Sequence, residues 1–188
     1  MANKVKYGLK NVYYAVAHIE ATNGTATYDT PVAWPGAVEL SLDPEGETSK
    51  FYADNIAYAQ FSANAGYSGS FESALIPETF KTSVLGEVAD TTGVIYEKAE
   101  GSAKPFALLF QFEGDDSATR HVLYNCVASR PSISGSTTEE SIEAQTESVD
   151  LTVSSIHNAT LNADIVKSRC AASVTTTYNG WFSAVYQA

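Results

Sequence analysis

The segment IPETFKTSVLGE, residues 76–87, is the one stretch of this sequence with a clear helical pattern. Pro77 suits the first position of a helix, where its missing N–H costs nothing. Glu78 places a negative charge in the first turn, where the helix dipole favours it. Gly86 is a natural left-handed stop. We therefore predict one short helix over about residues 77–85.

The apolar side chains of this helix are Phe80, Val84 and Leu85, which form one stripe along it. We expect all three to pack against the rest of the protein. A helix shorter than about 12–15 residues is marginal in water by itself, so a sheet must hold it. Two roles remain open. The helix covers one end of a β-sandwich, or it seals the seam between neighbouring copies of the chain.

Most of the remaining sequence alternates with period two, which is typical of β-strands. The cleanest hairpin joins residues 104–112 to residues 120–129 through the turn EGDDS. We expect one face of its first strand to carry Phe106, Leu108, Phe110 and Phe112, and one face of its second to carry Val122, Tyr124, Cys126 and Ala128. Further strands are predicted at residues 12–17, 38–42, 51–52, 56–63, 67–75, 94–98, 148–153, 165–174 and 181–186, with a turn at Ala65-Gly66.

The 188 residues suit a single domain, residues 1–188, with 44% hydrophobic and 18% charged residues. The predicted fold is mainly β: a β-sandwich or barrel-like domain with one short lateral α-helix and extended loops. No apolar run approaches the roughly 20 residues of a membrane span. The N-terminal segment has lysines without an apolar core after them, so we expect no secretory signal and a cytoplasmic origin.

The net charge of −11 comes from 22 acidic and 11 basic residues. Lys and Arg are absent between Lys10 and Lys50, and again between Arg130 and Lys167. Binding to a nucleic acid backbone requires basic side chains that displace counterions. The charge therefore excludes a protein that grips nucleic acid, although such a surface could border nucleic acid without holding it.

Residues with catalytic or metal-binding chemistry are scattered. His18, His121 and His157 have no metal-ligating partner at a regular spacing, and no phosphate loop or nucleophile motif occurs. Cys126 and Cys170 could bridge if the fold brought them together, but buried free thiols are the favoured interpretation. A Ser–His–Asp triad stays open, because its members need not be adjacent in sequence. We expect a non-enzyme without a cofactor or metal.

The sequence is rich in aromatic residues, with 11 Tyr, 8 Phe and 2 Trp. Aromatic residues are enriched at protein interfaces, so they serve either the core or self-assembly. Five segments resemble the major tail protein family of long-tailed bacteriophages, the tail-tube proteins: FKTSVLGE (80–87), KPFALLFQFEGD (104–115), YNCVASRPSI (124–133), EESIEAQTESVDLTVS (139–154) and NGWFSAVY (179–186). Ala144 departs from the proline expected of the family in that fourth segment.

The resemblance implies a β-sandwich-like domain with a flanking helix that closes into hexameric rings. Those rings would stack into the tail tube through which the genome passes. The implied partners are further copies of the chain and other tail proteins, such as tape-measure, terminator and distal tail proteins. The protein would be part of the virion tail, assembled in the host cytoplasm, with no cofactor, no catalytic residue, no membrane contact and no specific DNA binding.

Ring formation needs free edge strands, and stacking needs protruding loops. The loop between Leu42 and Phe51 is the first candidate, and residues 131–146 are the second. The inter-subunit candidates in the first loop are Asp43, Pro44, Glu45, Gly46, Glu47 and Lys50.

An acidic wall would repel DNA across a gap of about one Debye length, roughly 8 Å at physiological salt. The candidate acids for the lumen lie on or beside predicted strands: Glu39, Asp54, Glu72 and Asp150. Strand register decides which of them point inward.

Two other classes remain open. A virion decoration or cell-surface binding module would also be rich in aromatics, but it would stay a discrete monomer or small oligomer. A hydrolase on a β-sandwich would need clustered acids, a histidine and a pocket.

Overall fold

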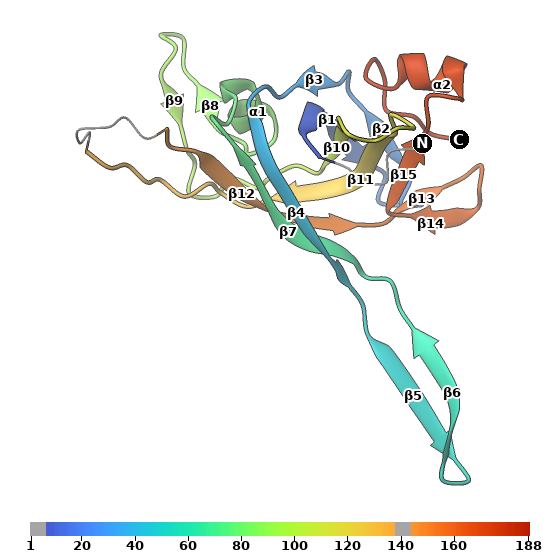
Figure 1. The fold of residues 1–188 in the computed structure, drawn as a ribbon. Coiled ribbons are helices and arrows are strands. Elements are labelled where there is room, and N and C mark those ends of the chain that lie inside the picture. The colour runs from blue at the N-terminus through green and yellow to red at the C-terminus, as the bar shows by residue number, and fades with distance from the viewer. Residues whose placement is uncertain (1–6, 138–143) are drawn as a thin grey trace.

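The structure is a computed structural model that describes residues 7–137 and 144–188. It is mainly β, as predicted, with two short helices (Figure 1). The strands of the main sheet are β1 (Leu9–Ile19), β2 (Ala26–Tyr28), β3 (Val32–Ala33), β4 (Ala37–Glu45), β7 (Gly66–Ser73), β10 (Phe106–Phe112), β11 (Arg120–Ala128), β12 (Glu147–Ser154) and β15 (Lys167–Cys170). Three separate pairs are β5 (Thr48–Ala53) with β6 (Ile56–Ser62), β8 (Val88–Ala89) with β9 (Ile95–Tyr96), and β13 (Ile156–Asn158) with β14 (Ala163–Ile165). The helices are α1 (Glu78–Ser83) and α2 (Thr175–Gly180).

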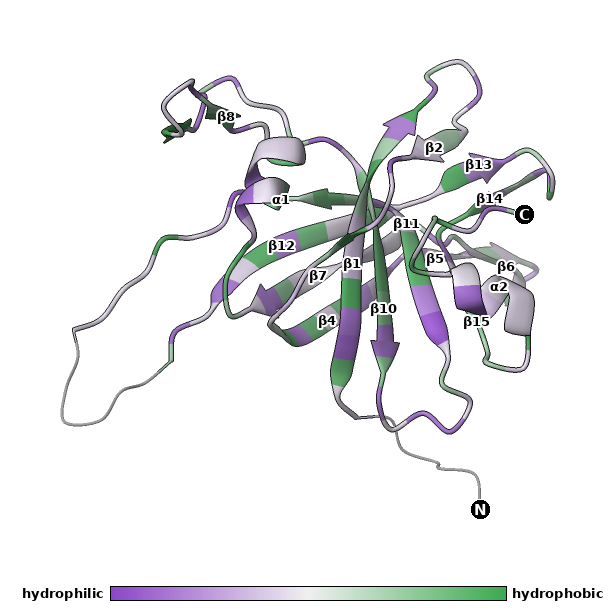
Figure 2. Cartoon of the chain, turned by 90° about the horizontal axis from the view of Figure 1, so that it is seen from above, coloured by the Kyte–Doolittle hydropathy of each residue, from purple (hydrophilic) through white to green (hydrophobic). Residues whose placement is uncertain are grey.

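The main sheet has nine antiparallel strands, with the order β2-β1-β10-β11-β12-β7-β4. The strand β15 pairs with β11, and β3 pairs with β1. At the far end of this order, β4 also lies against β1, so the sheet curls round on itself. Hydrophobic positions run along β1, β10 and β12 in the body (Figure 2). The result is a barrel-like body with its main core enclosed by the curled sheet.

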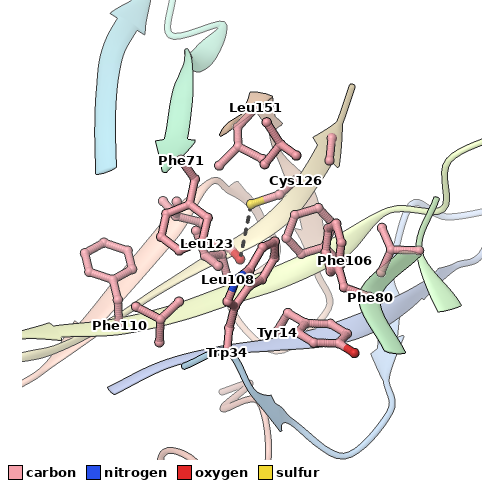
Figure 3. Close-up of a cluster of buried hydrophobic side chains, with 14 of the residues drawn as sticks. Tyr14, Trp34, Phe71, Phe80, Phe106, Leu108, Phe110, Leu123, Cys126 and Leu151 are labelled. Atoms are coloured by element: carbon pink, nitrogen blue, oxygen red, sulfur yellow. Dashed lines mark hydrogen bonds between the residues drawn. The ribbon is translucent and has the colours of Figure 1, made fainter. Parts of the chain in front are cut away.

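The main core is an aromatic cluster that α1 closes from the side. Phe80 has no exposed surface, and its ring lies 4.3 Å from that of Trp34 and 5.0 Å from that of Tyr14, measured between centroids (Figure 3). Val84 is also fully buried, and Leu85 packs against the same cluster in a partly buried position. The helix of two turns is therefore held by the sheet through the apolar stripe that the sequence predicts.

A second hydrophobic cluster lies on the opposite face of β10 and β11, beneath α2. It includes Leu109, Val122, Tyr124 and Trp181. Because the main core packs against its other face, β10 is buried on both sides. The second cluster fixes the orientation of the C-terminal segment on the sheet.

The strand predicted at residues 181–186 is wrong, because residues 175–180 form α2 and the chain after it has no strand. The guanidinium of Arg120 lies 3.7 Å from the ring centroid of Tyr178 and donates to its backbone carbonyl. Trp181 is 2% exposed and donates from its indole N–H to the carbonyl of His121. These tertiary contacts outweigh the strand propensity of the three threonines that begin α2.

The face predicted for the second strand of the hairpin is also wrong. Strands β10 and β11 do pair, but their register shifts between Phe106, which faces Cys126, and Leu108, which faces Leu123. The shift gives β11 one extra residue, which turns its side chains to the other face. Cys126 therefore joins the main core while Val122 and Tyr124 join the second cluster.

Candidate functional site

The most exposed feature of the fold is the arm, residues 48–62, in which β5 and β6 form a two-stranded ribbon that leaves the body (Figure 1). The chain reverses at Asp54 and Asn55, whose φ angles are 52° and 62°. Two successive left-handed residues are typical of the tight turns that suit hairpins. The predicted turn at Ala65-Gly66 is therefore wrong. At about 3.3 Å per residue, the nine residues from Gly46 to Asp54 carry the tip about 30 Å from the body.

The arm joins the body at the elbow, residues 46–47 and 63–65, where the two legs stay hydrogen-bonded. The amide of Ala63 donates to the carbonyl of Glu47 at 3.0 Å, and the amide of Ala65 donates to that of Glu45 at 2.9 Å. A Cβ atom on Gly46 would lie 2.0 Å from the carbonyl oxygen of Ala63, so only glycine fits. The elbow is thus a continuous ladder rather than a loose joint.

This ladder corrects the prediction of a loop between Leu42 and Phe51. Asp43, Pro44 and Glu45 belong to β4, Lys50 belongs to β5, and Gly46 and Glu47 form one side of the elbow. Pro44 and Gly46 are turn formers in most contexts. Proline is tolerated in β4 because β4 is an edge strand, where one side of the backbone needs no partner.

The arm has one apolar face. The pairs Phe51–Ala59 and Ala53–Ile56 place four apolar side chains on the same side of the ribbon, and the Ser49–Phe61 pair adds a fifth. Phe51 is 57% exposed, Ile56 61% and Phe61 63%. The opposite face is mixed: it carries Lys50 and Gln60, and also the Tyr52–Ala57 pair, in which Tyr52 is 63% exposed.

An arm of this kind is not stable by its own contacts. A two-stranded hairpin with no further packing is marginal at best in water. Exposed apolar patches commonly mark interaction sites. The arm therefore has the properties of a segment that becomes buried against another molecule.

The strand β4, which ends the hydrogen-bonded order of the main sheet and lies partly against β1, offers a second contact surface. Among the strands that the structure describes, β4 pairs with β7 alone. The outward backbone groups of an edge strand are a template for pairing with another chain.

Three of the four predicted lumen acids share one face of the sheet. Glu39 lies opposite Glu72 in the β4–β7 register, and Asp150 lies opposite Ser70 in the β12–β7 register. The alternate residues of β12, such as Val149, point into the main core. We call the surface of Glu39, Glu72 and Asp150 the acidic face. The fourth acid, Asp54, is not on it, because it lies in the turn at the tip of the arm.

The second predicted loop for stacking, residues 131–146, lies partly outside the residues that the structure describes. Residues 138–143 of the segment 131–146 are not among the described residues. Ile133, in its described part, is fully exposed.

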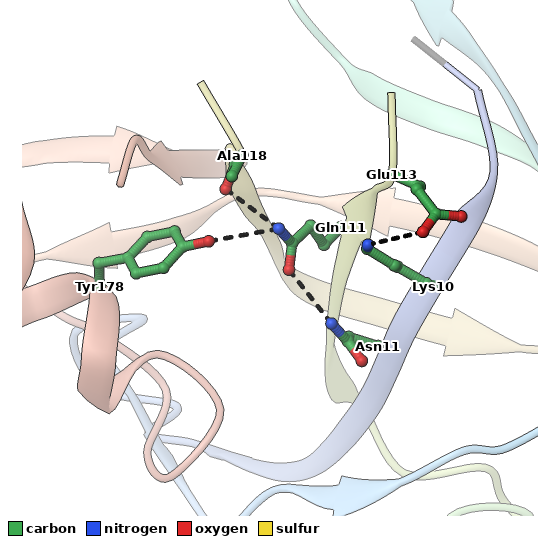
Figure 4. A network of polar contacts seen from close by, with 6 residues as sticks. All are labelled: Lys10, Asn11, Gln111, Glu113, Ala118 and Tyr178. Atoms are coloured by element: carbon green, nitrogen blue, oxygen red, sulfur yellow. Dashed lines mark hydrogen bonds and ion pairs between the residues drawn. The ribbon is translucent and has the colours of Figure 1, made fainter. Parts of the chain in front are cut away.

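A network of polar contacts in the body helps to hold the fold. Buried Gln111 accepts from Asn11 at 3.2 Å and donates to the carbonyl of Ala118 at 3.2 Å and to the hydroxyl of Tyr178 at 3.3 Å (Figure 4). These bonds join β1, the β10–β11 turn and α2. Nearby, Lys10 and Glu113 form an ion pair at 3.3 Å (Figure 4).

The histidines occupy separate places in the fold. The imidazole of His18 bonds Asp29 at 3.0 Å, that of His157 bonds Asp164 at 3.0 Å, and that of His121 stacks on Phe110. Within residues 7–137 and 144–188, neither His–Asp pair has a serine, threonine or cysteine hydroxyl or thiol in hydrogen-bond distance of the imidazole. Neither of these two pairs therefore forms a Ser–His–Asp triad within the described residues.

Cys126 and Cys170 are both buried free thiols. Burial raises the pKa of the Cys126 thiol far above its ordinary value, which keeps it protonated. Over the described residues, no group of three or more His, Cys, Asp or Glu side chains is arranged to hold a metal ion. None of the helices in this part of the chain is long and apolar enough to cross a membrane.

No protein-family model matches the chain, and no curated protein matches it. Among solved structures, the chain is similar to one in the cryo-EM structure of the anti-feeding prophage (AFP) baseplate, 6-fold symmetrised. The TM-score is 0.48 at 9% sequence identity, and the match covers 91% of this chain and 97% of that chain. A likeness this distant carries no argument about function.

Proposed function

We propose that this protein is a structural subunit of a phage virion, and specifically a tail-tube subunit. Its copies form hexameric rings that stack into a hollow conduit for the genome. Its further partners would be other tail proteins, such as the tape-measure, terminator and distal tail proteins. The protein acts without catalysis, cofactor or specific DNA binding.

The observation that carries this proposal is the arm. It extends about 30 Å from the body, and its apolar face holds Phe51, Ile56 and Phe61 more than half exposed. A soluble monomer gains nothing from such a segment, since exposed apolar area is stabilising only when it is removed from water. Contact with a neighbouring copy would bury it. The resemblance of five sequence segments to the tail-tube family supports the same role.

Two other surfaces fit this role. The edge strand β4 can pair with a strand of a neighbouring copy within a ring, which would remove its exposed backbone groups. In our proposal, the acidic face lines the conduit. Its three carboxylates would repel a duplex that carries about one negative charge per 1.7 Å.

The proposal is tested by removing the arm without disturbing the body. Residues 46–65 are replaced by Asn-Gly, a two-residue hairpin turn that joins the paired residues Glu45 and Gly66. We expect a folded monomer that no longer assembles. Assembly of this variant into tubes of normal length would remove the arm from the mechanism.

A finer variant tests the apolar face alone. Phe51→Ser, Ile56→Ser and Phe61→Ser together should leave the melting of the monomer unchanged, because exposed surface substitutions usually alter stability by less than about 0.5 kcal/mol. The same variant should lose assembly. The matched control is Lys50→Ser with Gln60→Ser on the opposite face, which should keep it.

The alternative function is a non-enzymatic binding or decoration module of a virion or cell surface. The exposed aromatic residues of the arm also favour it. The two functions differ in size distribution. A decoration module stays a monomer or small oligomer at every concentration, whereas a tube subunit forms long polymers.

A further inference from the structure

The body contains a pocket at the root of the arm, which we call the seam pocket. It forms because β11 is shared between two partners: β15 pairs with its first half, up to Leu123, and β12 pairs with its second half, from Asn125. The sheet therefore parts between β4–β7 and β10–β11–β15. The opening has a volume of about 230 Å³.

The seam pocket has a mixed lining, with apolar side chains on both of its sides and the polar residues His121, Lys167 and Ser168. Leu40, Leu42 and Tyr67 border it from the arm side, and Phe110 and Phe112 border it from the other side. Its volume is several times the roughly 30 Å³ that one water molecule occupies. One large apolar side chain therefore fits into it.

A positive charge stands at the mouth of the pocket. The ammonium of Lys167 donates to the hydroxyl of Tyr67 at 2.6 Å and lies 4.5 Å from the centroid of the same ring. Arg169 follows two residues later on the same face of β15. Among the described residues, no acidic side chain forms an ion pair with either cation, although the chain as a whole has a net charge of −11.

The tip of the arm has complementary chemistry. Asp54 lies in its turn, and Ile56, 61% exposed, directly follows the turn on the apolar face. The tip thus presents one carboxylate next to one large aliphatic side chain. The seam pocket presents the ammonium of Lys167, which has no acidic partner among the described residues, next to apolar side chains of its lining.

We propose that the seam pocket is the receptor for the arm tip of a second copy, with Ile56 in the cavity and Asp54 paired to Lys167. This proposal rests on the proposed function, since it names the surface that each arm meets. The hydrogen-bonded elbow holds the arm extended from its own body (Figure 1), so the tip in each pocket belongs to a neighbour.

The contact is heterologous, because the tip and the pocket are different surfaces of the chain. Repeated contacts of this kind close into rings where the rotation between copies closes and build open filaments where it does not. We place this contact between stacked rings, where it does not close. The pocket lies near the arm root, about twelve residues before the tip, so successive copies would repeat at roughly 30–40 Å along the arm direction. The length of the arm from the seam pocket to its tip therefore sets the axial spacing between copies.

A charge exchange tests the proposal. Lys167→Glu should raise the critical concentration for assembly at least tenfold, because a like-charge pair would replace the attraction. Lys98→Glu, the same charge change at an exposed residue beyond β9, is the control and should leave it unchanged. Adding Asp54→Lys to Lys167→Glu should restore assembly. Equal effects of Lys98→Glu and Lys167→Glu, or no rescue by the exchange, would overturn the proposal.

Cysteine cross-linking provides a second test that does not depend on charge. Ile56→Cys combined with Leu42→Cys should give a ladder of covalent multimers when assembled protein is oxidised. Ile56→Cys combined with Thr160→Cys, which is exposed and outside the pocket, should not. Tubes of the wild-type chain together with absent Ile56–Leu42 cross-links would contradict the receptor while leaving the proposed function intact. Failure of the wild-type chain to assemble at all would contradict both.

Discussion

Replacement of Phe80 by alanine tests how the helix α1 is held. The side chain has no exposed surface and lies against Trp34, Tyr14 and Phe106, with centroid distances of 4.3, 5.0 and 5.1 Å. Truncation of a buried Phe to Ala costs about 3–5 kcal/mol. Aromatic pairs add about 0.5–1.5 kcal/mol each beyond the area they bury. We therefore expect a loss near the upper end, about 4–5 kcal/mol.

The measurement is thermal unfolding of the monomer, monitored by the fluorescence of its tryptophans. For a chain of this size the melting temperature should fall by about 2–4 °C per kcal/mol, so by roughly 8–20 °C in total. Lys81→Ala is the matched control on the next residue. Its side chain is 26% exposed and 3.8 Å from Glu147, so its loss should cost less than about 1 kcal/mol. Equal losses for Phe80→Ala and Lys81→Ala would refute the packing argument.

Three further outcomes are expected. Cys126 should not react with a thiol reagent in the folded protein at neutral pH and should react after unfolding, because burial raises its pKa and excludes the reagent. The carboxylate of Asp90 accepts hydrogen bonds that lower its pKa below the ordinary 3.8, and the bond from the Thr92 hydroxyl has the largest effect. The turn that Asp90 holds through the amides of Thr92 and Val94 should therefore be fully ordered above about pH 4. It should lose this order only as the pH falls through the lowered pKa of Asp90, which a backbone amide NMR titration would show. Finally, lysine substitution of Glu39, Glu72 and Asp150 together should slow DNA ejection from assembled particles, and unchanged ejection would remove the acidic face from the conduit.

The body of the fold follows from the sequence because its signals are local. The alternation around Phe106 predicts β10 and its pairing with β11, and the spacing of Phe80 and Val84 predicts the helix. The side chains that form both patterns belong to the main core. The periodicity of apolar residues in a sequence reflects which side chains are buried.

The errors arise where a long-range contact or a free surface decides the structure. The segment from Asp43 to Lys50 has the composition of a loop, yet it continues two strands because its partner residues 60–68 lie directly opposite. The second helix depends on Arg120 and Trp181, which are far apart in sequence. The extra residue in β11 moves Tyr124 to the other face, and alternation in the sequence cannot show it.

The seam pocket had no signal in the sequence. Leu42, Phe112 and Lys167 come from three strands that meet only because β12 and β15 divide β11 between them. The arm had a partial signal, since Phe51, Ile56 and Phe61 are apolar in a stretch with no other core pattern. Only the structure shows that these side chains are exposed and so form an interaction surface instead of part of the core.

Negative-stain electron microscopy of the purified protein over a range of concentrations tests the central claim most directly. We predict hexameric rings that stack into hollow tubes, with an axial repeat of roughly 30–40 Å set by the arm. We also predict that the variant with residues 46–65 replaced by Asn-Gly gives no tubes. Compact monomers of the wild-type chain at every concentration, including in mixtures with partner tail proteins, would contradict the claim.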